Sequence, residues 1–280
     1  MRCGRFVTLL AAMVVVGTGM AEGTPQSSQP MECNCRITSF HYWMDSPDEF
    51  GNLVSATGRW DRRGWKGAAL FLGATYGLYA FDGSIQHWTQ DQRNSTTDRI
   101  ADFARPFGDG RYTLPGMGAF YLYGEFAKDN RARETALRGV ESFILTGLFT
   151  QAIKLGGHRH RPSEGDGARK WDGPSFGGGH MAFPSGHASS AFAVATAFAM
   201  EYRHTQWASP LAYGIASLTA WSRVNDNAHW ASDVFFGAAL GFLTSKSIIE
   251  LHRKWRIENA LVMPVSGGDA PLSFALSFQF

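Results

Sequence analysis

The sequence contains few cysteines, little net charge and no long uninterrupted hydrophobic run. Three cysteines in 280 residues are too few for a fold that depends on disulfide bonds. Lysine and arginine total 26 against 24 acidic residues, and the net charge of +2 gives no sign of the concentrated basic surface of a nucleic-acid-binding protein. The 32 glycines have no three-residue period, which excludes a collagen-like chain.

Apolar residues, in contrast, are abundant. Hydrophobic residues make up 44% of the chain and aromatic residues 14%, enough to bury a sizeable core, so the chain is not disordered as a whole. From about residue 64 onward, apolar segments alternate with glycine-rich and charged loops. We expect helices at Ala68–Phe81, Gly116–Phe126, Arg133–Leu155, His187–Tyr202, Leu211–Arg223 and His229–Lys254.

These segments predict an all-α fold. Most offer about fifteen apolar residues, fewer than the ~20 that cross a membrane, so core helices of a bundle are favoured over a multi-span protein. Periodicity alone does not separate the two. Gly237 and Gly241 favour close helix packing. Within 133–155 the apolar spacing is typical of a helix largely covered by its neighbours, with a stripe formed by Leu137, Val140, Ile144, Leu148 and Ala152.

The N-terminal region predicts export. Residues 1–21 combine two arginines, an apolar run and a small-residue end at Ala21, which is typical of a secretory signal peptide. A retained N-terminal anchor is the alternative. We therefore expect a protein of the periplasm or cell envelope. Residues 22–60 are predicted to be a flexible polar leader, in which Cys33 and Cys35 form a local or intermolecular disulfide.

Residues 61–256 are predicted to form one helical domain, followed by a strand or hairpin extension at 257–280. Apolar side chains fall on alternate positions of Leu272–Phe280, which is a strand pattern. Ala260–Val265 is the expected partner strand of a short C-terminal β-hairpin.

Three motifs carry the candidate chemistry, and the first is KLGGHRHRP at 154–162. Lys154 supplies a compact positive charge and Arg161 a rigid fork that can bind two oxygens, a combination suited to a tetrahedral oxyanion. A solvated basic loop is the alternative interpretation of this motif alone. Its two histidines, His158 and His160, are expected to face solvent, with a place at the mouth of the pocket as the alternative.

The second motif is PSGH at 184–187, at the start of an alanine-rich helix. Ser185 is placed to cap the helix, and Gly186 lets the backbone approach a ligand closely. Unpaired N–H groups at a helix start bind anions, and His187 lies beside them with a protonatable nitrogen. An ordinary capped helix is the alternative. His180, in the preceding glycine-rich loop, is a candidate for a substrate lid.

The third motif is SRVNDNAHWASD at 222–233. It adds Arg223 and places His229 and Asp233 four residues apart, on one face if both are helical. Asp233 could then hold one imidazole N–H and leave the other nitrogen free for nucleophilic attack. A structural ion pair and a pair of metal ligands are the alternatives.

Together the motifs Lys-x6-Arg-Pro, Pro-Ser-Gly-His and Ser-Arg-x5-His-x3-Asp resemble the signature of the type 2 phosphatidic acid phosphatase (PAP2) superfamily, which also includes vanadium haloperoxidases. The resemblance covers about 100 residues and every signature position from Lys154 to Asp233. It implies a helical bundle of the PAP2 type. It also implies that His229 is the nucleophile, with Asp233 orienting it and His187 as general acid. The phosphate ligands would be Lys154, Arg161, Ser185, Gly186 and Arg223.

The function expected from this resemblance is hydrolysis of phosphate monoesters or of lipid phosphates and diphosphates through a phosphohistidine. No metal or other cofactor is expected, since family members are typically metal-independent, and vanadate would act as an inhibitor. The alternatives are a vanadate-dependent haloperoxidase and a non-catalytic phospholipid-binding protein. The expected partner is a phosphorylated small molecule or a lipid head group, with membrane contact and without nucleic acid.

Overall fold

The computed structural model describes residues 61–177 and 179–262, with only the backbone described over 254–262. Its elements, in chain order, are α4 (Arg62–Gln92), α5 (Ser95–Ala104), the 3-10 helix η2 (Arg105–Gly108), α6 (Gly110–Phe126), α7 (Asn130–Gly157), the 3-10 helix η3 (Pro162–Glu164), α8 (Gly186–Glu201), α9 (Ala208–Asn225) and α10 (Ala231–Val262). The predicted all-α fold is confirmed, since these described residues form no β-strand beyond one isolated bridge between Arg159 and Trp171.

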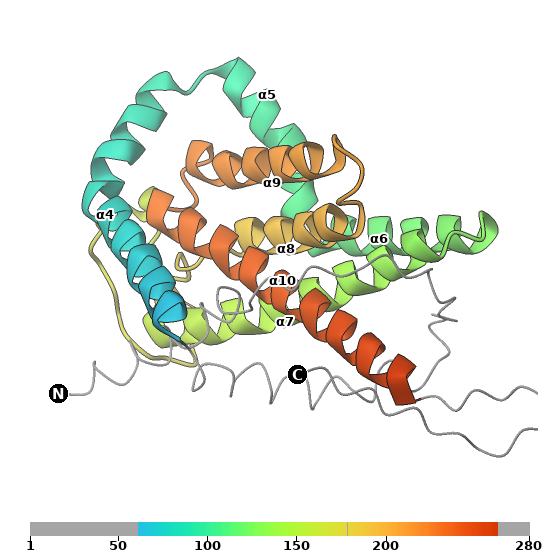
Figure 1. Ribbon diagram of the computed structural model, residues 1–280. Coiled ribbons are helices and arrows are strands. Elements are labelled where there is room, and N and C mark those ends of the chain that lie inside the picture. The colour runs from blue at the N-terminus through green and yellow to red at the C-terminus, as the bar shows by residue number, and fades with distance from the viewer. Residues whose placement is uncertain (1–60, 178, 263–280) are drawn as a thin grey trace, which may run out of the picture.

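Helix α8 lies at the centre of the bundle, in contact with α7, α9 and α10 (Figure 1). Two glycines of α10, Gly237 and Gly241, allow that helix to come close to α8. A Cβ atom added at Gly237 would lie 2.5 Å from the carbonyl oxygen of Ser185, and one at Gly241 would lie 2.0 Å from that of Ser189. The predicted close packing at these two glycines is therefore confirmed, and it fixes the start of α8 against the start of α10.

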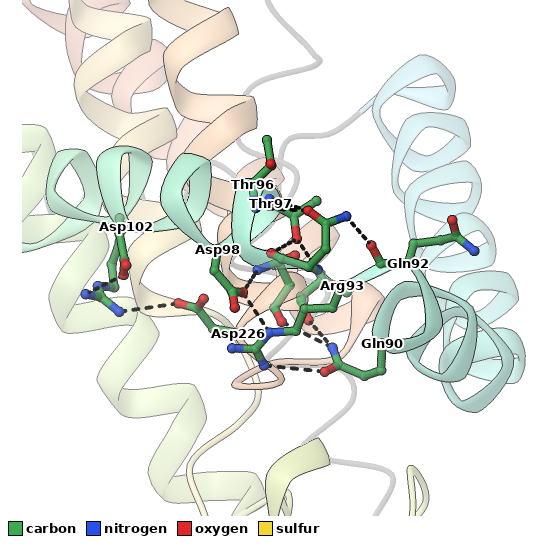
Figure 2. A network of polar contacts seen from close by, with 12 residues as sticks. Gln90, Gln92, Arg93, Thr96, Thr97, Asp98, Asp102 and Asp226 are labelled. Carbon is green, nitrogen blue, oxygen red and sulfur yellow. Dashed lines mark hydrogen bonds and ion pairs between the residues drawn. The ribbon is translucent and has the colours of Figure 1, made fainter.

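Helices α4 and α5 differ from the sequence prediction. Helix α4 extends beyond the predicted segment at both ends, and α5 was not expected because its first turn is polar. Asn94 caps α5 by accepting the N–H groups of Thr96 and Thr97. The start of α5 is held to the end of α9, since Asp98 accepts hydrogen bonds from Arg93 at 2.7 Å and from Asn225 at 3.0 Å (Figure 2).

The prediction that α7 buries its apolar stripe is wrong for part of that stripe. Leu137 is buried, but Ile144 and Leu148 are 46% and 59% exposed. The side of α7 that meets α8 instead carries small polar residues, and the Thr150 hydroxyl lies 3.0 Å from that of Ser189. Small side chains let the two helices pack closely, so the larger apolar side chains lie on the outer surface.

Both ends of α10 also differ from the prediction. The helix begins at Ala231 rather than His229. Asp233, the third residue of the helix, accepts a hydrogen bond from the Trp230 N–H at 2.9 Å, which is half of a capping box and makes Trp230 the N-cap. At the other end, residues 260–262 are helical and not the start of the predicted strand, since no proline or glycine follows Gly241 before Pro264. The predicted signal peptide, leader and final strand lie outside the described residues.

Helix α10 is also the one described helix that is long and apolar enough to cross a membrane, over Ala231–Arg253. In this window 61% of the helix is buried within the protein, against α4, α7, α8 and α9.

Candidate active site

The structure brings the three sequence motifs together at one end of the bundle. The first motif meets the loop just before the second, where the Lys154 ammonium donates a hydrogen bond to the carbonyl oxygen of Met181, at 2.5 Å. The second and third meet where the Ser185 N–H donates to the carbonyl oxygen of Asp233, at 3.0 Å. The end of α7, the start of α8, the end of α9 and the start of α10 thus surround a single site.

The imidazole of His229 is held by the backbone of the loop before α8. Its Nδ1 atom lies 2.7 Å from the carbonyl oxygen of Ala182, and the side chain is buried. A carbonyl oxygen only accepts hydrogen bonds, so Nδ1 must carry the proton. In the neutral ring, Nε2 then keeps its lone pair.

Electrostatics keep this ring neutral. Burial lowers the pKa of His229 well below its usual value, and the positive charges of Lys154, Arg161 and Arg223 lower it further. Protonation would add a fourth positive charge to a buried cluster of cations. The site therefore holds a buried imidazole with an unprotonated Nε2 among three positively charged groups.

The structure gives Asp233 a different contact from the one predicted. Its carboxylate lies 3.9 Å from His229 Nδ1, too far for a hydrogen bond, because His229 precedes α10 and its N–H is used by Ala182. Asp233 instead accepts from the Trp230 N–H at 2.9 Å and from Arg159 at 2.5 Å. Burial raises the pKa of Asp233 to about 6, although Arg159 and the Trp230 N–H oppose this rise.

Arg159 is a central residue of the site that the sequence analysis did not single out. Its guanidinium is fully buried and bridges two carboxylates, Asp82 on α4 at 2.7 Å and Asp233 on α10 at 2.5 Å. It also donates to the Ser232 hydroxyl at 2.8 Å and lies over the rings of Tyr79, Trp171 and Trp230. Arg159 thereby joins the first motif, the third motif and α4.

The three positively charged residues predicted to bind phosphate all act electrostatically on His229. Burial, together with repulsion from Arg161, lowers the pKa of Lys154 to about 8. Arg223 pairs with Asp226 at 2.8 Å through one terminal nitrogen, while its Nε atom is buried and has no hydrogen-bond partner within the described residues. Because Lys154 and the Arg223 Nε retain donor capacity, an anion bound here would gain charge-assisted hydrogen bonds.

Ser185 and Gly186 lie at the N-terminus of α8, as predicted. The Ser185 side chain does not cap the helix, and its hydroxyl is buried without a hydrogen-bond partner among the residues described. The first backbone N–H groups of α8 have no partner inside the helix. A hydroxyl donor, backbone donors and the positive end of the helix dipole are therefore available to an anion.

His187 is half-buried in the first turn of α8. Burial lowers its pKa to about 4, and repulsion from Arg223, Arg105 and Lys154 contributes, while Asp109 acts in the opposite direction. Two negative charges on a bound phosphoryl group would offset these cations and raise the pKa of His187. The ring is thus placed to hold a proton when an anion is bound.

The expectation that His158 and His160 face solvent is wrong. Both are buried, at 3% and 5% exposure. The Nε2 atom of His158 lies 3.2 Å from the carbonyl oxygen of Gly177, and His160 lies between the carboxylates of Asp166 and Asp172. The glycines before His158 predicted a solvated loop, but the segment after α7 folds back over α10, where the Trp230 indole donates to the His160 carbonyl oxygen at 2.8 Å.

Residues 135–257 match the PAP2 superfamily. The match includes all three motifs and confirms the resemblance inferred from them. Over 65 residues, 23% of the chain, the sequence is 49% identical to a Lipid A 1-phosphatase of Porphyromonas gingivalis. The matched segment spans 15% of the length of that relative.

Two solved structures resemble the fold. One is a transmembrane PAP2-type phosphatidylglycerolphosphate phosphatase from Bacillus subtilis, at a TM-score of 0.49 and 19% identity, covering 66% of this chain and 96% of that one. The other is LpxE from Aquifex aeolicus, at a TM-score of 0.44 and 18% identity, covering 60% of this chain and 93% of that one.

Proposed function

We propose that this protein is a phosphatase that hydrolyses phosphate esters through a phosphohistidine at His229. The observation that carries the proposal is the buried, neutral imidazole of His229, whose Nδ1–H is held by Ala182 while three cations lie near the ring. Binding of an anion alone would not require a nucleophilic nitrogen among those cations. The PAP2 domain and the Lipid A 1-phosphatase relative support the same class of reaction.

In the first step, His229 Nε2 attacks phosphorus and the bond between phosphorus and the leaving oxygen breaks. His187 gives its proton to the departing alkoxide, so an alcohol is released. In the second step, His187 accepts a proton from water, the water oxygen attacks phosphorus, and the bond between phosphorus and Nε2 breaks. Inorganic phosphate leaves, and both imidazoles return to their starting states.

Stabilisation of the transition state is assigned to Lys154, Arg161, Arg223 and the N-terminus of α8. Phosphoryl transfer needs mainly positioning and neutralisation of the equatorial oxygens, and these groups supply both. The proposed reaction therefore uses no metal. Vanadate, which can adopt a trigonal-bipyramidal arrangement, should occupy the same position as an inhibitor.

We further propose that the substrate is amphiphilic. A groove of about 840 Å³ lies between η2, α6, α8 and α9, with an almost wholly apolar lining that includes Phe107, Met117, Phe120, Val194, Phe198 and Leu211. Its end at η2 adjoins the site, since a Cβ atom at Gly108 would lie 2.4 Å from the His187 carbonyl oxygen. An acyl chain attached to the phosphate ester could occupy this groove, because both are apolar and the groove begins beside the proposed general acid.

Contact with a membrane is part of the same proposal, together with export to the periplasm or cell envelope. The outer faces of α4, α6 and α9 carry large exposed apolar side chains, among them Tyr76, Phe81, Trp88, Leu122, Phe126 and Leu218. Exposed apolar surface of this extent marks interaction sites, and a lipid surface is the natural source of an amphiphilic phosphate.

The proposal is tested with the purified protein, p-nitrophenyl phosphate and the variant His229→Ala. Turnover should be lost, and the parent should form an acid-labile phosphohistidine that the variant lacks. His204→Ala, at an exposed histidine away from the site, is the control and should retain activity. Phosphatase activity that survives His229→Ala contradicts the proposal, and bromide oxidation with vanadate and peroxide would favour a haloperoxidase.

A further inference from the structure

A second cluster of ionisable side chains lies in the segment between α7 and α8, outside the proposed phosphate site. It contains two histidines, His160 and His180, and three carboxylates, Glu164, Asp166 and Asp172. One donor atom from each of His160, Glu164 and His180 lies within 4.8 Å of the others. The proposed phosphatase mechanism uses none of these side chains.

The two imidazole rings are stacked face to face, with their Nδ1 edges on the same side. Their centroids are 3.5 Å apart and their planes differ by 14°. Both Nδ1 atoms face Glu164 Oε2, at 3.5 Å from His160 and 2.7 Å from His180. Both Nε2 atoms face Asp172 Oδ2, at 3.0 Å and 3.8 Å.

The Nδ1 edge has the composition of a metal site. Two imidazole nitrogens and Glu164 Oε2 converge there, and Asp166 Oδ2 lies 2.6 Å from His160 Nδ1. Two nitrogen and two oxygen donors match the four-coordinate sites preferred by Zn²⁺, whereas Ca²⁺ and Mg²⁺ prefer oxygen alone. Protonation of both stacked rings would instead place two like charges face to face.

The opposite edge supplies the support that histidine ligands usually have. A metal-bound imidazole generally donates its other N–H to a carboxylate, which fixes its tautomer and orientation. Asp172 is placed to accept from His160 Nε2 at 3.0 Å, which would leave the Nδ1 lone pair of that ring directed toward Glu164 and Asp166. The Arg161 N–H donates to Glu164 Oε2 at 2.8 Å and orients that carboxylate.

From this arrangement we propose that His160, His180, Glu164 and Asp166 bind a divalent transition-metal ion of the Zn²⁺ type. The ion links the start of the segment between α7 and α8 to its end, since every ligand lies within that segment. That segment carries Arg161, and His180 is two residues from Ala182, whose carbonyl oxygen holds His229. The role is structural, and the proposed phosphoryl transfer does not pass through the ion.

The test uses the full chain after removal of metals with EDTA. Isothermal titration with Zn²⁺ alone should show one site, and Zn²⁺ should raise the melting temperature of the parent by mass action. His180→Ala and Glu164→Gln should each weaken binding at least about 10-fold. His87→Ala, at an exposed histidine on α4, is the matched control and should bind Zn²⁺ like the parent.

Asp172→Asn provides a milder variant in case a ligand substitution impairs folding. It keeps the size of the side chain but weakens the acceptor that fixes the His160 ring, so Zn²⁺ affinity should fall while the fold is retained. Two outcomes overturn the proposal: no Zn²⁺ binding by the folded parent, or equal affinity in the parent and in His180→Ala. Phosphatase activity of the metal-free parent is measured separately, so the two proposals can fail independently.

Discussion

The Nδ1 atom of His229 lies 2.7 Å from the carbonyl oxygen of Ala182, and 3.9 Å from the carboxylate of Asp233. The backbone therefore fixes the tautomer of the proposed nucleophile. This differs from sites in which an aspartate holds the N–H of a catalytic histidine directly. Asp233 can influence His229 through the backbone at Trp230 and through Arg159, which makes it a positioning residue.

Asp233→Asn should therefore lower kcat by much less than the roughly 10⁴-fold loss seen where aspartate sets the tautomer. Ala182 still accepts the Nδ1–H in this variant, so KM for p-nitrophenyl phosphate should change little. Steady-state kinetics with p-nitrophenyl phosphate provide the measurement: similar losses in kcat and in kcat/KM show that KM is unchanged. A loss as large as that of His229→Ala would show that the carboxylate acts directly on the ring.

Arg159→Met should destabilise the fold by about 3–5 kcal/mol, because it leaves the buried carboxylates of Asp82 and Asp233 without their cation. Arg159→Lys should restore only part of the loss, since one ammonium cannot bridge both carboxylates as the guanidinium fork does. Urea unfolding provides the measurement. Arg111→Met removes an exposed ion pair with Asp109 and should change stability little, and equal losses in the two methionine variants would contradict this interpretation.

The sequence located the three motifs better than it predicted the contacts that their residues make. The three motifs and most helices could be located because each has a local signature in residue type and spacing. The partner of His229 is a backbone carbonyl, which has no signature of its own. Arg159 was obscured by its basic neighbours, and its partner Asp82 lies 77 residues away on α4.

The surface of the bundle could not be predicted from periodicity for a related reason. An apolar stripe on α7 predicts that some face is apolar, but it does not identify what covers that face. Here the small polar side of α7 meets α8, and Leu148 lies on the outer surface. Which helix faces pack together depends on how closely the helices can approach each other. Gly237 and Gly241 were the local sequence feature that indicated such close approach.

The pH dependence of activity should respond to the charges around His187. The proposed general acid is active when protonated, so kcat/KM falls as pH rises through its pKa, which is about 4 in the free protein. Asp109 raises this pKa, so Asp109→Asn should move the alkaline limb to lower pH while asparagine still caps α6.

Arg105 acts on His187 in the opposite direction, so Arg105→Gln should move the same limb to higher pH. Profiles of kcat/KM for p-nitrophenyl phosphate would show both shifts. Shifts of the two variants in the same direction, or none in either, would exclude His187 as the group that titrates.

Close packing of α8 against α10 should be sensitive to a single methyl group. Gly241→Ala would place a Cβ atom 2.0 Å from the Ser189 carbonyl oxygen and 2.9 Å from the Ala193 nitrogen, so the helices must separate. We expect a loss of about 1–3 kcal/mol or more in unfolding free energy. Gly214→Ala, in a helix with nothing within 4 Å of the new atom, should instead be neutral or stabilise by up to about 1 kcal/mol.

The apolar groove can be blocked without touching the site. Gly116 lines the groove on α6, and its added Cβ atom would meet nothing within 4 Å, so Gly116→Trp can project into the groove without a backbone clash. Gly118 is equally open on the same helix but does not line the groove, which makes Gly118→Trp a matched control.

For a long-chain alkyl phosphate in detergent micelles, Gly116→Trp should lower kcat/KM by about 10-fold, the loss of roughly two buried methylene groups at ~0.8 kcal/mol each. Hydrolysis of p-nitrophenyl phosphate, which has no chain to place in the groove, should stay at the parent rate in both tryptophan variants. If the parent prefers p-nitrophenyl phosphate regardless of detergent, or if Gly118→Trp loses as much as Gly116→Trp, the groove does not bind the acyl chain. The phosphohistidine chemistry at His229 would still stand in that case, because its test depends on the imidazole alone.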